Sequence, residues 1–297
     1  MVSYRLAEVT KATMFKTFEA HPRLQDFILF YFELNWQKKH PNETIKHLSL
    51  PTGCSFMGFQ SIGTMQVQIE DSTYPTETYF VNAQTTFPYY MRYAGDHLKA
   101  IVACLKPTTL HHLFKIDVSR IVNTGVNPTT LFKGKLDNAF QTHLTSNTTP
   151  QNIQALDTLF IQQLDTAQPR FNFIDAAIDT IITSKGELKL HELVDTLGVS
   201  KRYFQKKFKE MVGISPSTYQ HIIRYNFIFS SLTAKEPSYK ATDASFYFYD
   251  SAHYSKDFKK FWGMSPSEFN PDQHPFLKLT AIEKAAWISS FKSLTTA

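Results

Sequence analysis

Hydrophobic residues recur at helical spacing through most of the last third of the chain, and one such pattern occurs twice. The string FQKKFKEMVGISPSTY (204–219) aligns with YSKDFKKFWGMSPSEF (254–269) when the sequence is shifted by fifty residues. Apolar residues match at positions i, i+4, i+7 and i+8, which lie on one face of a helix. In each copy a glycine (Gly213, Gly263) suits a helix C-cap, and Ser-Pro then suits the start of the next helix. The repeat predicts two copies of one helical unit.

In the first copy a second, shorter helix precedes this pattern. Leu190, Leu193, Val194 and Leu197 form its apolar stripe, which Gly198 ends. Ser200 can then cap a new helix with an apolar inner face. Its outer face carries Lys201, Arg202, Gln205, Lys206 and Lys209. Two helices joined by a short turn, with hydrogen-bond donors on the second, predict a helix-turn-helix whose second helix fits the major groove of DNA. An exposed Lys/Arg/Gln face is also compatible with a plain solvent-facing surface.

The two copies are connected by a segment with the pattern of a single helix. Thr218 to Leu232 predicts a helix of about fifteen residues, roughly 22 Å long at 1.5 Å per residue. A rigid connection of this size can hold two recognition helices in successive major grooves, about 34 Å apart. One chain would then bind an asymmetric, bipartite site on double-stranded DNA.

The first half of the chain has a different pattern, in which short β-type segments alternate with turns. Residues 45–105 are rich in Thr, Tyr, Phe and Val and are interrupted by Pro and Gly. Thr64–Glu70 alternates, and Leu98–Leu105 is typical of a buried strand. We expect a sheet or small barrel there, followed by helices after Pro107. A loop is expected at 145–152, and a second one at 165–170.

Length and composition are those of a two-domain globular protein. The chain has 297 residues, of which 42% are hydrophobic and 19% charged. No apolar run is long enough for a membrane span or a secretory signal, so we expect a cytoplasmic protein with no membrane partner. Cys54 and Cys104 lack CxxC spacing, which favours reduced, buried thiols over a disulfide or zinc site.

Positive charge is concentrated in the repeated region. Residues 189–262 contain twelve Lys or Arg and seven Asp or Glu, an excess of five that equals the net charge of +5 for the whole chain. A basic excess confined to one region favours a polyanionic partner, although a solvated lysine face is the commoner cause of such an excess.

Residues from about 171 to 276, which contain both helical units and the basic excess, resemble the DNA-binding domain of the AraC/XylS family of transcription regulators. The resemblance is carried by ELVDTLGVSKRYFQKKFKEMVGISPSTY, by FYDSAHYSKDFKKFWGMSPSEF and by the long helix between them. It implies that two recognition helices read bases. The implied base-reading residues are Arg202, Gln205, Lys206, Ser251, Ala252, Ser255 and Lys256. The implied phosphate contacts are Ser200, Lys201, Tyr203, Lys209, His253, Lys259 and Lys260.

The second unit departs from the family pattern. Thr242-Asp243 replaces the usual Ile-Ala pair, and Tyr247 replaces a glycine of the turn. A buried Asp243 would be costly without a partner, and Ser251 and Ala252 offer few long donors. The first unit is therefore expected to carry most of the base reading, with the second acting as a phosphate clamp. The alternative function is a ligand-binding or protein-interaction module whose degenerate second unit does not read DNA.

The resemblance also implies that the N-terminal half senses a small molecule or mediates dimerisation, with RNA polymerase as a partner if the protein is an activator. Loose candidates for an apolar ligand site are Phe56, Phe59, Phe87, Tyr89 and Tyr90, for each of which core packing is the simpler role. The N-terminal histidines have no metal-binding spacing, and neighbouring His111 and His112 should point to different faces of a helix. No catalytic motif is present, so we expect no enzyme activity, cofactor or metal.

These expectations give an α+β protein in three parts. Residues 1–168 are expected to form a β-rich, barrel-like sensor or dimerisation domain with trailing helices. Residues 169–276 are expected to form an all-α domain of two helix-turn-helix units joined by a long helix. Residues 277–297 are expected to be a helical tail that either packs on the domain or joins a dimer interface.

Overall fold

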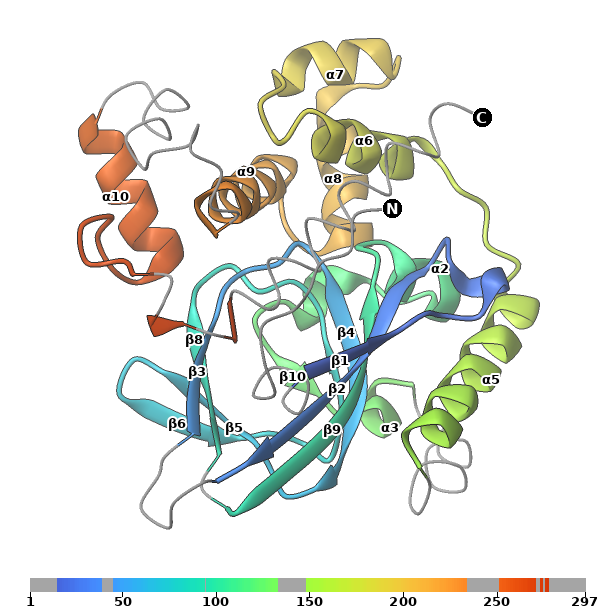
Figure 1. Cartoon of the computed structure of the whole chain (residues 1–297). Coiled ribbons are helices and arrows are strands. Elements are labelled where there is room, and N and C mark those ends of the chain that lie inside the picture. The colour runs from blue at the N-terminus through green and yellow to red at the C-terminus, as the bar shows by residue number, and fades with distance from the viewer. Residues whose placement is uncertain are drawn as a thin grey trace, which may run out of the picture.

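The structure, a computed structural model, describes residues 15–38, 45–93, 95–132, 148–233, 251–270, 273–274 and 276–277. Its strands form two sheets in the N-terminal half, and helices α6 to α10, which fall within residues 173–262, lie together at one end of them (Figure 1). This confirms the predicted α+β class with a β-rich N-terminal part and a helical C-terminal part. The described strands do not close into a single barrel, so the barrel-like expectation is corrected to a pair of sheets.

The larger sheet has six strands in the order β1-β2-β9-β4-β7-β10. Their bounds are β1 Phe15–Phe18, β2 Ile28–Gln37, β9 His97–Leu105, β4 Ser55–Ile62, β7 Tyr79–Asn82 and β10 Gly125–Val126. The smaller sheet has four strands in the order β3-β8-β5-β6. Their bounds are β3 Ile45–Ser49, β8 Tyr89–Tyr93, β5 Gln66–Ile69 and β6 Ser72–Pro75. All the recorded strand pairs are antiparallel.

Strand β9 lacks polar alternation because both of its faces are covered. Ile101 and Ala103 on one face belong to a core with helices α2 (Thr109–Phe114) and α5 (Thr149–Ala167). Val102 and Cys104 on the other face line a cavity. Successive strand residues point to opposite faces, so a strand covered on both sides must be apolar throughout. The buried-strand prediction for Leu98–Leu105 is confirmed.

Helices and 3₁₀ turns lie between and after the strands. They are the 3₁₀ turn η1 Pro22–Leu24 between β1 and β2, helix α2 Thr109–Phe114 after β9, the 3₁₀ turn η2 Val118–Ile121 before β10, helix α3 Pro128–Leu131 and the long helix α5 Thr149–Ala167. The loop predicted to extend to residue 152 ends earlier, because Thr148 and Gln151 form a capping box in which the Thr148 N–H donates to Gln151 Oε1 at 2.9 Å. Helix α5 also continues through Asp165 to Ala167, so the second predicted loop begins only at Gln168.

The C-terminal helices are α6 Phe173–Thr183, α7 Leu190–Thr196, α8 Lys201–Val212, α9 Pro216–Thr233 and α10 Ser251–Trp262. Helices α7 and α8 form the first predicted unit, and α9 is the predicted connection, three residues longer than expected. The supporting helix of the second unit, with Thr242, Asp243 and Tyr247, falls outside the described residues, as does the tail beyond Leu277.

One hydrophobic core joins the two halves of the chain. It contains Leu50, Cys54 and Cys104 from the strands and their connections together with the buried faces of α6, α8, α9 and α10. Both cysteines are buried and neither forms a disulfide, as predicted. The helical region is therefore packed directly on the open end of the sheets.

Candidate nucleic-acid interface and ligand cavity

The first helix-turn-helix has the local geometry that its sequence predicts. Gly198 has φ +64°, a left-handed conformation that favours glycine, and it ends the turn that follows α7. Ser200 then caps α8, since its Oγ accepts a hydrogen bond from the Tyr203 N–H at 3.3 Å. The cap fixes where α8 begins and so fixes which side chains lie in its first turns.

Helix α8 separates an apolar face from a donor-rich face. Phe204 and Phe208 are buried in the core that joins the two halves of the chain, with ring centroids 5.7 Å apart. The three implied base readers of this unit, Arg202, Gln205 and Lys206, are exposed. Within the part of the chain that the structure describes, none of the three forms an ion pair. These guanidinium, amide and ammonium groups are free to donate to a ligand.

The implied phosphate contacts of the first unit surround this face. Ser200, Lys201 and Lys209 are exposed, and Tyr203 is 46% exposed while its ring lies 5.6 Å from that of Phe173. Lys207 differs from the other lysines, because its Nζ donates to Glu210 Oε1 at 3.0 Å and Oε2 at 2.9 Å. The free positive charge of α8 is thus on the same side as the base-reading candidates.

In the second unit, α10 repeats the separation of faces. Phe258 and Trp262 are buried, with parallel rings 4.9 Å apart, whereas Ser255, Lys256, Lys259 and Lys260 are exposed. Ser251, Ala252 and His253 lie in the first turn of α10, but their side chains are outside the description. Gly263 has φ +77°, which matches Gly213 at φ +100° and confirms the paired C-caps. Residues 266–268 form a turn and not the predicted helix.

Helix α9 packs on both recognition helices. Near its start, the Tyr219 ring lies 5.7 Å from Phe208 of α8. Further along, Tyr225 stacks on Phe261 at 4.5 Å and Phe229 lies 5.0 Å from Trp262 of α10. The same rigid helix therefore fixes α8 and α10 relative to each other.

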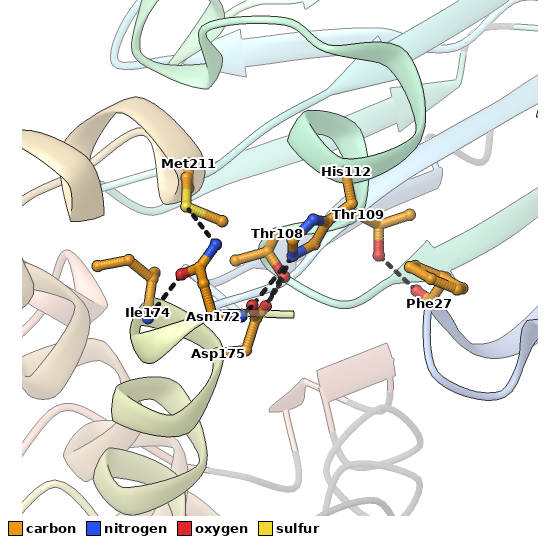
Figure 2. Close-up of polar contacts among 8 residues, drawn as sticks. All are labelled: Phe27, Thr108, Thr109, His112, Asn172, Ile174, Asp175 and Met211. Atoms are coloured by element: carbon orange, nitrogen blue, oxygen red, sulfur yellow. Dashed lines mark hydrogen bonds and ion pairs between the residues drawn. The ribbon is translucent and has the colours of Figure 1, made fainter. Parts of the chain in front are cut away.

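The start of α6 is held by the N-terminal half through a polar cluster that sequence reasoning missed (Figure 2). Asp175 of α6 accepts from Thr108 Oγ1 at 2.8 Å and from His112 Nε2 at 2.9 Å and 3.1 Å. Burial raises the pKa of Asp175, but the hydrogen bonds from His112 and from the Asn172 N–H outweigh it and leave that pKa below its usual value. His111 binds the Ile116 carbonyl instead, so the adjacent histidines do point apart as predicted.

Beside this cluster lies a cleft of about 440 Å³ between the Lys106–Thr108 segment and α6, with charged side chains in its wall. Burial lowers the pKa of Lys106, and the carboxylates of Asp26, Asp179 and Asp175 oppose that shift. Burial also raises the pKa of Asp179. The Lys106 ammonium therefore lies near three carboxyl groups at the junction of the two halves of the chain.

An apolar cavity lies between the two sheets at the end that faces the helices. Its volume is about 100 Å³. Of the five aromatic candidates, Phe56 and Tyr89 line it. Phe59 instead packs in the core beneath α2 and α5, and Phe87 and Tyr90 are half-buried elsewhere. The wall also includes Phe276 and Leu277, which lie beyond the second helix-turn-helix unit.

Two family models match separate parts of the chain. Residues 193–271 match a family described as helix-turn-helix domain, and residues 16–127 match a domain of unknown function (DUF6597). No curated protein matches the chain by sequence.

Among the described residues, no group of His, Cys, Asp or Glu is arranged to hold a metal ion. No described helix is long and apolar enough to cross a membrane.

Similar solved structures include ToxT from Vibrio cholerae, which is 11% identical, with 80% of this chain and 97% of that chain covered and a TM-score of 0.41. Another is wild-type ToxT from the same organism bound to an unsaturated fatty acid, at 12% identity, 80% and 92% coverage and a TM-score of 0.40. The AraC-like transcriptional activator CuxR is 13% identical, with 78% and 90% coverage and a TM-score of 0.26. Likeness at this level carries no inference about ligands or partners.

Proposed function

We propose that this chain, which belongs to the AraC/XylS family of transcription regulators through its helix-turn-helix region, reads bases with α8 and grips phosphates with α10. Transcription regulators of this family are not a class of enzymes. The observation that carries the proposal is the exposed face of α8, where Arg202, Gln205 and Lys206 project opposite a buried aromatic face. Arg suits guanine and Gln suits adenine in the major groove.

The unequal roles of the two helices follow from their exposed side chains. The described exposed residues of α10 include Lys256, Lys259 and Lys260, which are point charges suited to phosphate oxygens. Helix α8 adds the planar guanidinium of Arg202 and the amide of Gln205, which can form directional pairs with base edges. Sequence preference should therefore come mainly from α8.

The experiment is selection of sites from random duplex DNA, followed by affinity measurements with Arg202→Ala, Lys256→Ala and the control Lys16→Ala. Lys16 is an exposed lysine of β1, far from both recognition helices in sequence. We expect Arg202→Ala to cost about 1–3 kcal/mol on the selected site and to relax preference at one base pair. Lys256→Ala should weaken all duplexes alike and reduce the salt slope by about one.

Equal and strongly sequence-specific losses in both variants would overturn this division of roles. If the affinity of the unmodified protein for DNA does not depend on salt concentration, the proposal of DNA binding is itself wrong. That result would favour a protein-interaction module. Lys16→Ala should behave like the unmodified protein, which separates local contacts from a general change in charge.

We also propose that a small, neutral and mainly apolar molecule in the cavity regulates this binding. In support, Cys54 and Cys104 belong both to the cavity wall and to the core shared with α8 and α9. A ligand that moves these walls therefore acts on the same core that holds the DNA-binding helices. Dimer formation and contact with RNA polymerase stay predictions from the family resemblance.

A further inference from the structure

We infer that Phe276 and Leu277 occupy part of the ligand cavity and that a ligand displaces them; this inference rests on the ligand cavity of the proposed function. The ligand of the cavity then carries a hydrogen-bonding group, which takes the place of the Phe276 ring beside Trp36 and His47. Ligand entry would detach the segment that follows the second helix-turn-helix from the N-terminal half.

The first observation is the position of the segment. Phe276 is 7% and Leu277 3% exposed, and both lie in the cavity wall among residues of the two sheets. The Phe276 ring lies 6.1 Å from Phe15, 5.8 Å from Trp36 and 5.5 Å from His47, measured between ring centroids. A side chain from the far end of the described chain thus fills space inside the N-terminal half.

The second observation is that the groups around Phe276 lack polar partners. Trp36 is 0% exposed, and among the described residues its Nε1 and the Nε2 of His47 are buried without a hydrogen bond. The two rings lie 4.6 Å apart, and both contact the Phe276 ring. A phenyl ring cannot accept a normal hydrogen bond, so each buried nitrogen costs about 1–3 kcal/mol in this state. A carbonyl or hydroxyl in place of the ring would relieve that cost.

The cavity wall narrows the class of ligand further. No charged side chain lines it within the described ranges, and its polar groups are neutral ones such as Ser49, Thr52 and Asn82. Asn82 Oδ1 is a further buried acceptor that has no partner in the described part of the chain. Burial lowers the pKa of His47 to about 4, which keeps its imidazole neutral at physiological pH. An ion would lack a counter-charge here, so the site suits an uncharged molecule with an apolar body.

The third observation is the connection from Phe276 back to the second unit. Phe269 packs on Trp262 of α10 at 4.5 Å, and His274 stacks on Phe269 at 5.8 Å with the rings 9° apart. Gly263, at the end of α10, lies so close to the N-terminal half that an added Cβ would be 3.2 Å from Pro88 Cγ. The Phe276–Leu277 segment thus helps to hold α10 against the sheets, and its release would free α10 to adjust to a second groove.

The test uses the full chain and two neutral probes, 2-naphthol and naphthalene, with binding measured by calorimetry near pH 7. The double variant Phe276→Ala/Leu277→Ala should bind 2-naphthol at least about tenfold more tightly, because the competitor is gone. It should prefer 2-naphthol over naphthalene several-fold, and Trp36→Phe added to it should reduce that preference. A double variant that binds no better than the unmodified protein, or that shows no preference, overturns the inference.

Phe56→Ala is the matched control, since it enlarges the same cavity from β4 without altering the segment. Hydrogen exchange of the α10 amides distinguishes enlargement of the cavity from loss of the Phe276 and Leu277 side chains. In the unmodified protein 2-naphthol should speed this exchange. In the double variant it should already be fast and insensitive to the probe. Phe56→Ala should leave α10 slow until the probe is added, and the β9 amides should stay protected in every variant, which verifies folding.

If 2-naphthol binds the unmodified protein and α10 exchange is unchanged or slower, ligand and segment bind together and the inference is wrong. If no variant binds either probe, the ligand cavity of the proposed function fails as well. DNA binding by Arg202 and its neighbours is measured separately, so its outcome is independent of both results.

Discussion

Asp175 is the residue whose removal should most clearly reveal how firmly α6 and the N-terminal half are joined. Its carboxylate accepts hydrogen bonds from Thr108, His112 and the Asn172 N–H, the last of these at 2.8 Å (Figure 2). Asp175→Ala leaves His112 and Thr108, both buried, without that partner, and removes the capping box at the start of α6. Hydrogen bonds to a charged group contribute about 1.5–3 kcal/mol each and a helix cap about 1 kcal/mol. Because these contributions share one group and are not additive, we expect a loss of about 3 kcal/mol.

The measurement is calorimetric unfolding at neutral pH, with Asp179→Ala as the control. Asp179 lies one turn further along α6 in the same cleft, where burial raises its pKa and so disfavours its charged form. Its removal should be neutral or slightly stabilising, whereas Asp175→Ala should lower the melting temperature by several degrees. The reasoning is refuted if Asp175→Ala costs less than about 0.5 kcal/mol, the level of an ordinary surface substitution, or if the two variants lose stability equally.

Two further predictions concern backbone strain and pH. Gly213→Ala should cost about 1–3 kcal/mol in urea unfolding, because a Cβ there would lie 2.8 Å from Val122 Cγ2 at a φ of +100°. Gly198→Ala, with φ +64° and nothing within 4 Å, should cost about 1 kcal/mol, and the opposite order of losses would contradict this account. Burial lowers the pKa of His47 from 6.5 to about 4, so its stabilising effect is complete above pH 6.5 and is lost as pH falls towards 4. Unfolding measured from pH 7 to 4 should show a loss of up to about 3 kcal/mol that His47→Gln removes; an unchanged pH profile in that variant would exclude His47 as its source.

The helix-turn-helix was readable from the sequence because its determinants are local. Gly198 and Ser200 set the turn and the start of α8 within three residues, and Phe204 and Phe208 mark the buried face. The start of α5 was predicted too late, although its signal is also local, since Thr148 and Gln151 have the spacing of a capping box. These signals depend on neighbours along the chain and on no distant contact.

The cavity was only partly readable, and strand geometry explains which residues line it. Phe56 and Phe59 are three apart in β4, so they point to opposite faces of the sheet, and only Phe56 reaches the cavity. Tyr89 and Tyr90 are adjacent in β8 and are separated in the same way. The contribution of Phe276 was not readable, because it contacts strands more than two hundred residues earlier in the chain.

The exposed face of α8 bears on how the proposed regulation by a ligand would work. Arg202, Gln205 and Lys206 are already accessible while Phe276 and Leu277 fill the cavity, so a ligand has no need to uncover the first recognition helix. Binding to two successive major grooves also requires that α10 is held in a defined position relative to α8. Helix α10 is connected to the cavity through the Phe276–Leu277 segment. Under the proposed mechanism the ligand therefore changes the fit of the second unit, and its effect should be largest on DNA sites that contain both half-sites and smallest on a single half-site.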